Sequence, residues 1–95
     1  MIFILNIQKE INKKIGINLI NTNNGVQIES LAEFPNLDIR KNILIGDFIL
    51  SVNGKKSETA YFTSKYIIEN GPIISLCINR EDNQIFEKNK YLYIL

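Results

Sequence analysis

Hydrophobic and polar residues divide this chain into short apolar segments separated by turn-forming residues. The clearest pair starts with Ile15–Asn21, an apolar run entered through Gly16, and continues after a turn at Asn23-Asn24-Gly25. The segment Val26–Leu31 then alternates apolar and polar positions, which is typical of a strand with one buried face. Because asparagine and glycine favour tight hairpin turns, we expect the two segments to pair as antiparallel strands.

A further segment, Phe48–Val52, is almost continuously apolar and has a turn signal at each end. Gly46-Asp47 precedes it, and Asn53-Gly54 follows it with the residue pair that most easily adopts positive φ. Apolar side chains fall on both faces of this strand, at Phe48, Leu50 and Val52 and at Ile49. The pattern therefore predicts a central strand covered from both sides.

Two more strands are predicted near the ends of the chain. Ile2–Ile7 is apolar except at Asn6, which favours a strand covered by the rest of the domain, and Ile73–Asn79 is a second apolar run. The polar segments Gln8–Lys14 and Lys55–Glu58 are expected to be solvated connections.

Two helices are predicted between these strands. The residues after Pro35 can form one or two helical turns, with Asn36 as N-cap and Asn42 ending the helix in the left-handed region. Thr59 is a suitable N-cap for a longer helix over Ala60–Asn70. The predicted class is mainly β with two helices (α+β): a partly open antiparallel β-barrel or sandwich capped by one short and one longer helix.

Length and composition agree with one small domain. The chain has 95 residues, 45% of them hydrophobic, and a net charge of +1. Its basic residues are scattered among acidic ones, so nucleic-acid binding is not expected. Cys77 is the only cysteine, is expected to be a small buried hydrophobe, and excludes an internal disulfide. Polar residues interrupt the first apolar run before it could serve as a signal sequence, so a cytoplasmic protein is expected.

Catalysis is not expected from these residues, and neither is a cofactor or a metal. The chain contains no histidine, which excludes histidine-based catalysis and metal sites. Ser51 and Ser57 have no base to activate them. No spacing pairs the available carboxylates for acid–base chemistry; these are Glu29, Asp38, Asp47 and Glu58.

The central strand and its turns resemble the PDZ family, whose fourth strand typically has the sequence G-D-x-I-L-x-V-N-G. Here the corresponding residues are Gly46-Asp47-Phe48-Ile49-Leu50-Ser51-Val52-Asn53-Gly54, and the resemblance extends from Lys14 to Arg80. It implies a single PDZ-like domain over residues 1–83 with the strand order of eukaryotic signalling PDZ domains. It also implies a structural role for Asp47 at the start of the central strand.

The resemblance implies a binding loop before the second strand. Lys14-Ile15-Gly16-Ile17 matches the family's Gly-Leu-Gly-Phe, whose backbone N–H groups hold the terminal carboxylate of a peptide. Lys14 replaces the first glycine, although its positive charge favours a carboxylate nearby. The alternative is a plain turn in which Gly16 only satisfies the backbone geometry.

A peptide groove between the second strand and the longer helix is also implied. Ile15, Ile17, Leu19 and Ile67 would form an aliphatic pocket for a Val, Leu or Ile at the end of a partner. Ala60 or, with a one-residue gap, Tyr61 would select the third-last residue, and Ala60 favours a Φ-x-Φ terminus. The predicted groove residues are Asn18, Leu19, Ile20, Ala60, Tyr61, Ser64 and Ile67.

The last segment, residues 84–95, lies outside the family's usual boundary. It is strongly β-prone, and it is interpreted as an extra strand, as a terminus at Tyr93-Ile94-Leu95 that occupies its own or a neighbour's groove, or as a sequence that continues in a longer chain. The predicted function is binding of a partner's C-terminal peptide, with membranes reached only through that partner. The alternatives are a regulatory fragment of a larger enzyme such as a protease, or a structural domain whose groove holds its own tail.

Overall fold

The computed structural model describes residues 1–81, which form six strands and two helices. In chain order these are β1 (Ile2–Gln8), β2 (Ile17–Thr22), β3 (Gly25–Leu31), α1 (Leu37–Asn42), β4 (Phe48–Val52), β5 (Lys55–Lys56), α2 (Ala60–Glu69) and β6 (Ile73–Asn79). The predicted C-terminal extension lies outside the described residues. No helix among residues 1–81 is both long and apolar enough to cross a membrane.

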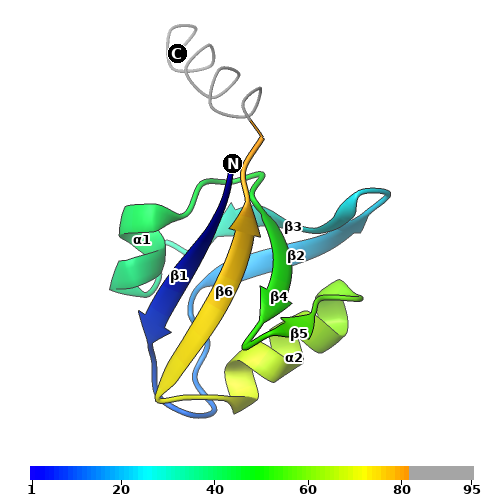
Figure 1. Ribbon diagram of the computed structural model, residues 1–95. Helices are drawn as coiled ribbons and strands as arrows, with labels where there is room; N and C mark the ends of the chain where they lie inside the picture. Colours follow the sequence, from blue (N-terminus) through cyan, green and yellow to red (C-terminus); the bar gives the residue numbers. More distant parts are fainter. Residues whose placement is uncertain (82–95) are drawn as a thin grey trace, which may run out of the picture.

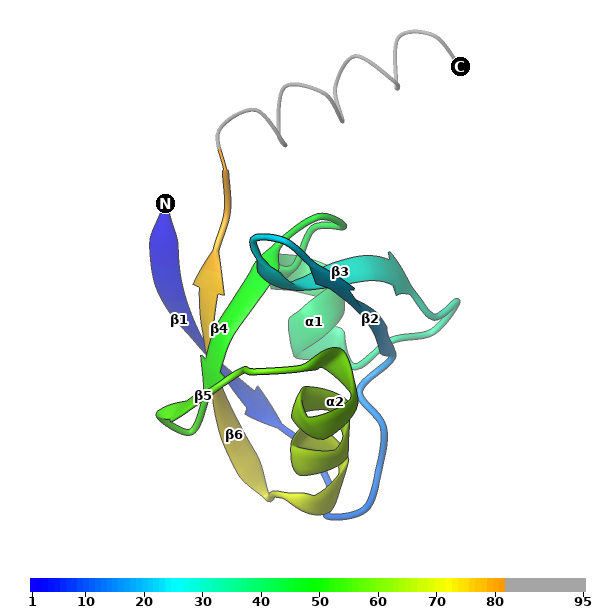
Figure 2. The same ribbon diagram turned by 90° about the vertical axis from the view of Figure 1, so that its right-hand side faces the viewer.

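All strands belong to one antiparallel sheet with the order β1-β6-β4-β3-β2, and β5 pairs with β4 beside this path. β1 and β2 are the two ends of the path, so the sheet curves without closing into a barrel. Figure 1 shows α1 beside β1, and Figure 2 shows α2 alongside β2. The predicted mainly β class with one short and one longer helix is confirmed.

β4 lies in the middle of the sheet, as its sequence predicts, but it is not covered on every side. Phe48, Ile49 and Val52 are buried, whereas Leu50 is 37% exposed. The register against β6 shifts between Ile49 and Ser51, so Leu50 is an extra residue in the ladder. Its side chain therefore does not join the core, and the expectation of full coverage was wrong at this position.

β1 is an edge strand, not the covered strand that its composition suggested. Among the strands of residues 1–81 it pairs only with β6, and Ile2 and Ile4 are 64% and 61% exposed. The alternate positions Phe3, Leu5 and Ile7 pack on the core instead. One face of β1 is therefore exposed, because no helix or strand of the described residues covers it.

Both predicted N-caps are confirmed. Asn36 accepts a hydrogen bond from the Asp38 N–H, and Thr59 accepts one from the Phe62 N–H. The predicted left-handed end at Asn42 was wrong, because Asn42 is the last helical residue, its side-chain amide donates to the Asp38 carbonyl at 2.8 Å, and the C-cap Ile43 is extended. α2 ends at Glu69, one residue earlier than predicted.

After β4, the turn at Asn53-Gly54 was predicted correctly, whereas Lys55 and Lys56 were wrongly predicted to be part of a solvated connection. Asn53 and Gly54 adopt φ values of 51° and 77°, which form the tight turn that the sequence indicated. Lys55 and Lys56 then pair with Val52 and Ser51 as β5. A strand of two residues is too short to show an alternating pattern in the sequence, and its pairing with β4 follows from the tight turn.

The core is formed mainly by isoleucine side chains between the sheet and the two helices. Cys77 is half-buried and carries a free thiol, so it lies less deep than expected. Asp47 is fully buried before β4, where its carboxylate accepts hydrogen bonds from Arg80 at 2.9 and 2.8 Å. This bond to Asp47 raises the pKa of the Arg80 guanidinium and fixes the end of β6 against β4.

Candidate functional site

The edge of β2 lies open beside α2. Within residues 1–81, β3 is the only strand that pairs with β2, so alternate residues of β2 direct their N–H and C=O groups away from the sheet. Figure 2 shows α2 running along this edge. The backbone N–H and C=O groups of Ile17 point away from β3. The carbonyl of its neighbour Gly16 accepts a hydrogen bond from the Ala32 N–H at 2.8 Å, so Ile17 and Leu31 are a non-hydrogen-bonded pair.

The loop before β2 also directs backbone amides toward the open side. The Ile15 carbonyl accepts from the Asn36 N–H at 2.9 Å, and the Gly16 carbonyl accepts from Ala32. In a planar trans peptide the following N–H points opposite to the carbonyl. The N–H groups of Gly16 and Ile17 therefore point away from the segment 32–36 and toward the groove.

Gly16 cannot be replaced in this loop without a change in the backbone. Its φ is +86°, and a Cβ atom there would lie 2.7 Å from the Cα and 2.9 Å from the Cβ of Pro35. Both the backbone conformation and the close approach of Pro35 therefore require glycine. The segment after β3 and the loop before β2 are in direct contact here.

A pocket of about 280 Å³ opens between this loop, β2 and α2. It brings together seven of the predicted site residues and adds Ile68, which the sequence did not single out. The lining residues are Lys14, Ile15, Ile17, Asn18, Leu19, Ser64, Ile67 and Ile68. Ile15 and Ile67 are 2% exposed and form its floor, so the same side chains serve the core and the pocket.

The other predicted site residues do not line this pocket. Gly16 contributes only backbone, and Ile20 is 40% exposed because it lies on the opposite face of β2 from Leu19. Ala60 is the first residue of α2, one helical turn before Ser64 and on the same side of the helix. Tyr61 is 67% exposed and lies on an adjoining side.

Lys9 was missed by the sequence analysis. The segment Gln8–Lys14 was expected to be solvated, yet Lys9 is only 8% exposed. Its ammonium group donates to the carbonyls of Glu10 at 2.7 Å, of Ile68 at 3.1 Å and of Asn70. Burial lowers the pKa of Lys9. The sequence spacing could have indicated this burial, because Lys9 lies two positions after the buried Ile7 and therefore on the same face of the chain.

A separate polar contact joins β2 to the N-terminal end of α2. The Asn21 side-chain oxygen accepts a hydrogen bond from the Ala60 N–H at 2.7 Å, next to the Thr59 cap. At the C-terminal end of α2, the Asn12 N–H donates to the Ile68 carbonyl at 2.7 Å, beside the Lys9 contacts. Hydrogen bonds from the β2 side thus hold α2 at both ends, and the pocket lies between them.

Comparison with known proteins gives structural matches only. No protein-family model and no curated protein sequence matches the chain. Among solved structures, the fifth PDZ domain of InaD has a TM-score of 0.72 at 20% identity, with 86% of this chain and 93% of that chain covered. The N-terminal PDZ domain of InaD, solved with a NorpA C-terminal peptide, has a TM-score of 0.67 at 25% identity over 82% and 95%. A choanoflagellate GIPC PDZ domain has a TM-score of 0.72 at 14% identity over 86% and 92%.

Proposed function

We propose that this chain, which has the fold of a PDZ domain, is a noncatalytic module that binds the C-terminal peptide of a partner protein. The peptide would add to the open edge of β2 as a strand, opposite α2. The observation that carries the proposal is this open edge beside an apolar pocket and a loop with inward-pointing amides. A solved domain of similar fold, the N-terminal PDZ domain of InaD, contains a C-terminal peptide of NorpA.

The backbone of the peptide would supply most of the directional contacts. Ile17 and Leu19 present N–H and C=O groups on the free side of β2, and an antiparallel strand can pair with both. Since the loop of inward amides precedes β2, the end of the peptide would lie at the start of β2. The peptide would therefore run antiparallel to β2.

The terminal carboxylate would be held by the N–H groups of Gly16 and Ile17. Successive amides that converge on one point form an anion site, and hydrogen bonds to a charged acceptor are the stronger kind. Lys14 lines the same pocket and adds a positive charge. We therefore expect a free carboxylate to be required for binding.

The last side chain of the peptide would enter the pocket formed by Ile15, Ile17, Leu19 and Ile67. All four are aliphatic, so a terminal Val, Leu or Ile is favoured. The third-last residue would lie nearer the start of α2, where Ala60 precedes Ser64 by one helical turn. Ala60 offers an apolar space and no hydrogen-bond donor, which supports a Φ-x-Φ preference.

The test is a library of C-terminal peptides measured by fluorescence polarisation, with each preferred peptide also made as its amide. Loss of the carboxylate is expected to weaken binding about tenfold or more, the effect of losing a charged hydrogen bond. Equal affinity of free and amidated peptides would refute carboxylate recognition. Replacing Ala60 by His should shift the third-last preference toward Ser or Thr, and an unchanged preference would refute Ala60 as the selector.

Two neighbouring variants of β2 locate the binding face. Leu19→Ala removes pocket surface, so the peptide affinity should fall about fivefold to tenfold. Ile20→Ala removes a similar side chain from the opposite face and should change the affinity by less than about twofold. If no peptide binds the full chain but peptides bind after deletion of residues 84–95, the groove is occupied by the chain's own tail, which was the alternative interpretation.

A further inference from the structure

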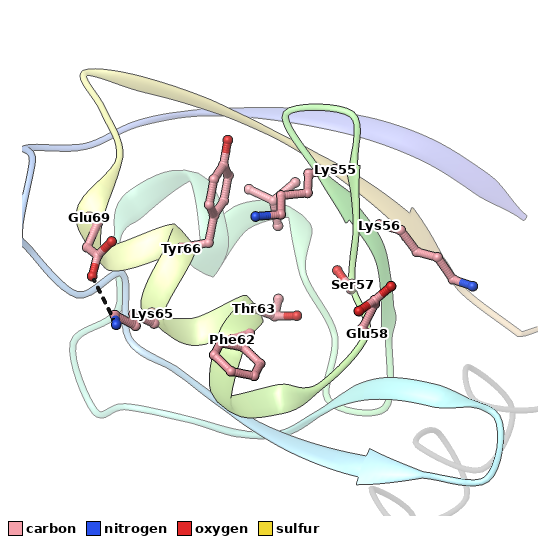
Figure 3. A pocket seen from close by; sticks show the side chains of 10 residues that line it. Lys55, Lys56, Ser57, Glu58, Phe62, Thr63, Lys65, Tyr66 and Glu69 are labelled. Atoms are coloured by element: carbon pink, nitrogen blue, oxygen red, sulfur yellow. Dashed lines mark ion pairs between the residues drawn. The ribbon is translucent and has the colours of Figure 1, made fainter.

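A second cavity, which we call the β5–α2 pocket, lies on the other side of α2 from the peptide groove. Its volume is about 410 Å³, and it opens between α2 and the segment that contains β5 (Figure 3). It shares no lining residue with the groove pocket. The lining residues are Val52, Lys55, Lys56, Ser57, Glu58, Phe62, Thr63, Lys65, Tyr66 and Glu69.

Two buried hydroxyl groups face each other across this pocket. Thr63 is only 4% exposed, and neither its Oγ1 atom nor the buried Oγ atom of Ser57 has a hydrogen-bond partner within residues 1–81. Figure 3 shows Thr63 on α2 and Ser57 on the facing segment. A buried hydroxyl without a partner is unfavourable, and alanine or valine would fit such positions without that cost. The two hydroxyls therefore point to a polar group that enters the pocket.

The charges around the pocket indicate the sign of that group. Lys55 and Lys56 form no ion pair within the described part of the chain, and the Lys55 ammonium lies 5.0 Å from the centre of the Tyr66 ring. Lys65 is already paired with Glu69 at 4.0 Å, which leaves Glu58 as the one acid against two ammonium groups. The polar group is therefore expected to be an anion.

We propose that the β5–α2 pocket binds a small organic phosphate monoester. Ser57 and Thr63 would donate from inside and Lys55 and Lys56 from the rim, which suits a phosphate because it has three strong acceptor oxygens. The organic part would lie on Phe62, a residue that lines the pocket and is 64% exposed. The volume is within the roughly 300–1,000 Å³ of small-molecule sites.

This site is separate from the proposed peptide function, so either can fail without the other. The same phosphate chemistry occurs in soluble metabolites and in the headgroups of phosphorylated lipids. A phosphate on a soluble ester and one on a lipid would meet the same four donors, so the experiment must compare both.

The test uses the full chain and amide NMR, with phenyl phosphate as the soluble probe. Phenol and sulfate at equal ionic strength are the controls for the ring and for charge alone. We expect saturable shifts at Ser57 and Thr63 with phenyl phosphate. Shifts spread over all lysines would overturn the proposal, and so would the absence of binding at Ser57 and Thr63 with both phenyl phosphate and the vesicles described below.

Variants separate the hydroxyls from general charge. Thr63→Val and Ser57→Ala should each weaken phenyl phosphate binding about tenfold, since each removes one hydrogen bond to a charged group. Thr63→Ser should retain the affinity, and Lys41→Met, on the exposed side of α1, should change it by less than about twofold. Unchanged affinity in both Thr63→Val and Ser57→Ala would overturn the proposal.

Vesicles identify the source of the phosphate. Phosphatidylcholine vesicles are compared with the same vesicles containing a minority of phosphatidylinositol phosphate. Thr63-dependent binding to the second kind alone, without binding of phenyl phosphate, would support the site and assign it to a lipid headgroup. Binding to neither vesicles nor phenyl phosphate would overturn it.

Discussion

Lys9 should be one of the most sensitive positions of the domain although it lies in a loop. Its ammonium group donates to three backbone carbonyls, two of which belong to the C-terminal end of α2. Its own N–H also donates to the Pro72 carbonyl at 2.8 Å. Lys9→Met keeps the buried hydrocarbon stem and this backbone bond, and it removes only the three donors.

The expected cost follows from two opposing effects. A hydrogen bond from a charged group contributes roughly 1.5–3 kcal/mol, and the carbonyls left behind are partly shielded from water. Against this, removing the ammonium group also removes the unfavourable free energy of burying a charge. The same burial lowers the pKa of Lys9. We expect a net loss of about 2–3 kcal/mol in the free energy of unfolding, or roughly 10–20 °C in Tm for a domain of this size.

Urea unfolding followed by circular dichroism measures this loss, and Lys13→Met is the matched control. Lys13 lies in the same loop, is exposed, and changes by the same atoms, so its variant should stay within about 0.5 kcal/mol of the parent. If Lys9→Met is as stable as Lys13→Met, the contacts with α2 contribute nothing and the reasoning is refuted. Peptide affinity should fall with Lys9→Met alone, because the loop before β2 would no longer be held.

Three other predictions test separate parts of the structure. Gly16→Ala should lower the free energy of unfolding by about 2–4 kcal/mol, because it adds a clash with Pro35 to the strain of positive φ. Gly54→Ala has open space around it and should cost about 1 kcal/mol. Equal losses for the two variants in urea unfolding would mean that the contact with Pro35 does not matter. Arg80→Met should cost about 3–5 kcal/mol by removing the counter-ion of the buried Asp47, and a loss below about 1 kcal/mol would contradict this. Thr63→Val should raise the free energy of unfolding by about 1 kcal/mol, since it removes a buried hydroxyl that has no partner within residues 1–81; a loss of stability measured by urea would show that the hydroxyl is satisfied in solution.

The sequence predicted those elements whose cause is local. The caps at Asn36 and Thr59 and the turn at Asn53-Gly54 depend on a few adjacent residues, and each formed as expected. The apolar residues that line the pocket could also be predicted from the sequence. They follow from strand alternation and helical spacing once the family resemblance aligns β2 with α2.

The remaining features depend on contacts between residues far apart in the chain. The exposed face of β1 follows from its place at the end of the sheet, and hydrophobicity alone does not distinguish an edge strand from a covered one. Lys9 resembles any solvated lysine until the end of α2 is placed next to it. The contact between Asn21 and Ala60 likewise spans 39 positions, so no local sequence pattern predicts it.

The two tethers of α2 explain how an open strand edge can persist next to a helix. Asn21 holds the first residue of α2, and Lys9 holds the carbonyls at its last turn, so neither end of the helix can move toward β2 without losing hydrogen bonds. Between the ends, Leu19 and Ser64 both line the pocket, and within residues 1–81 the only hydrogen bond between β2 and α2 is the one from the Ala60 N–H to Asn21. The separation of the two walls is therefore set by polar contacts at the two ends of α2. An added strand would meet a gap that is already open, and it would not have to displace a helix that had packed into it.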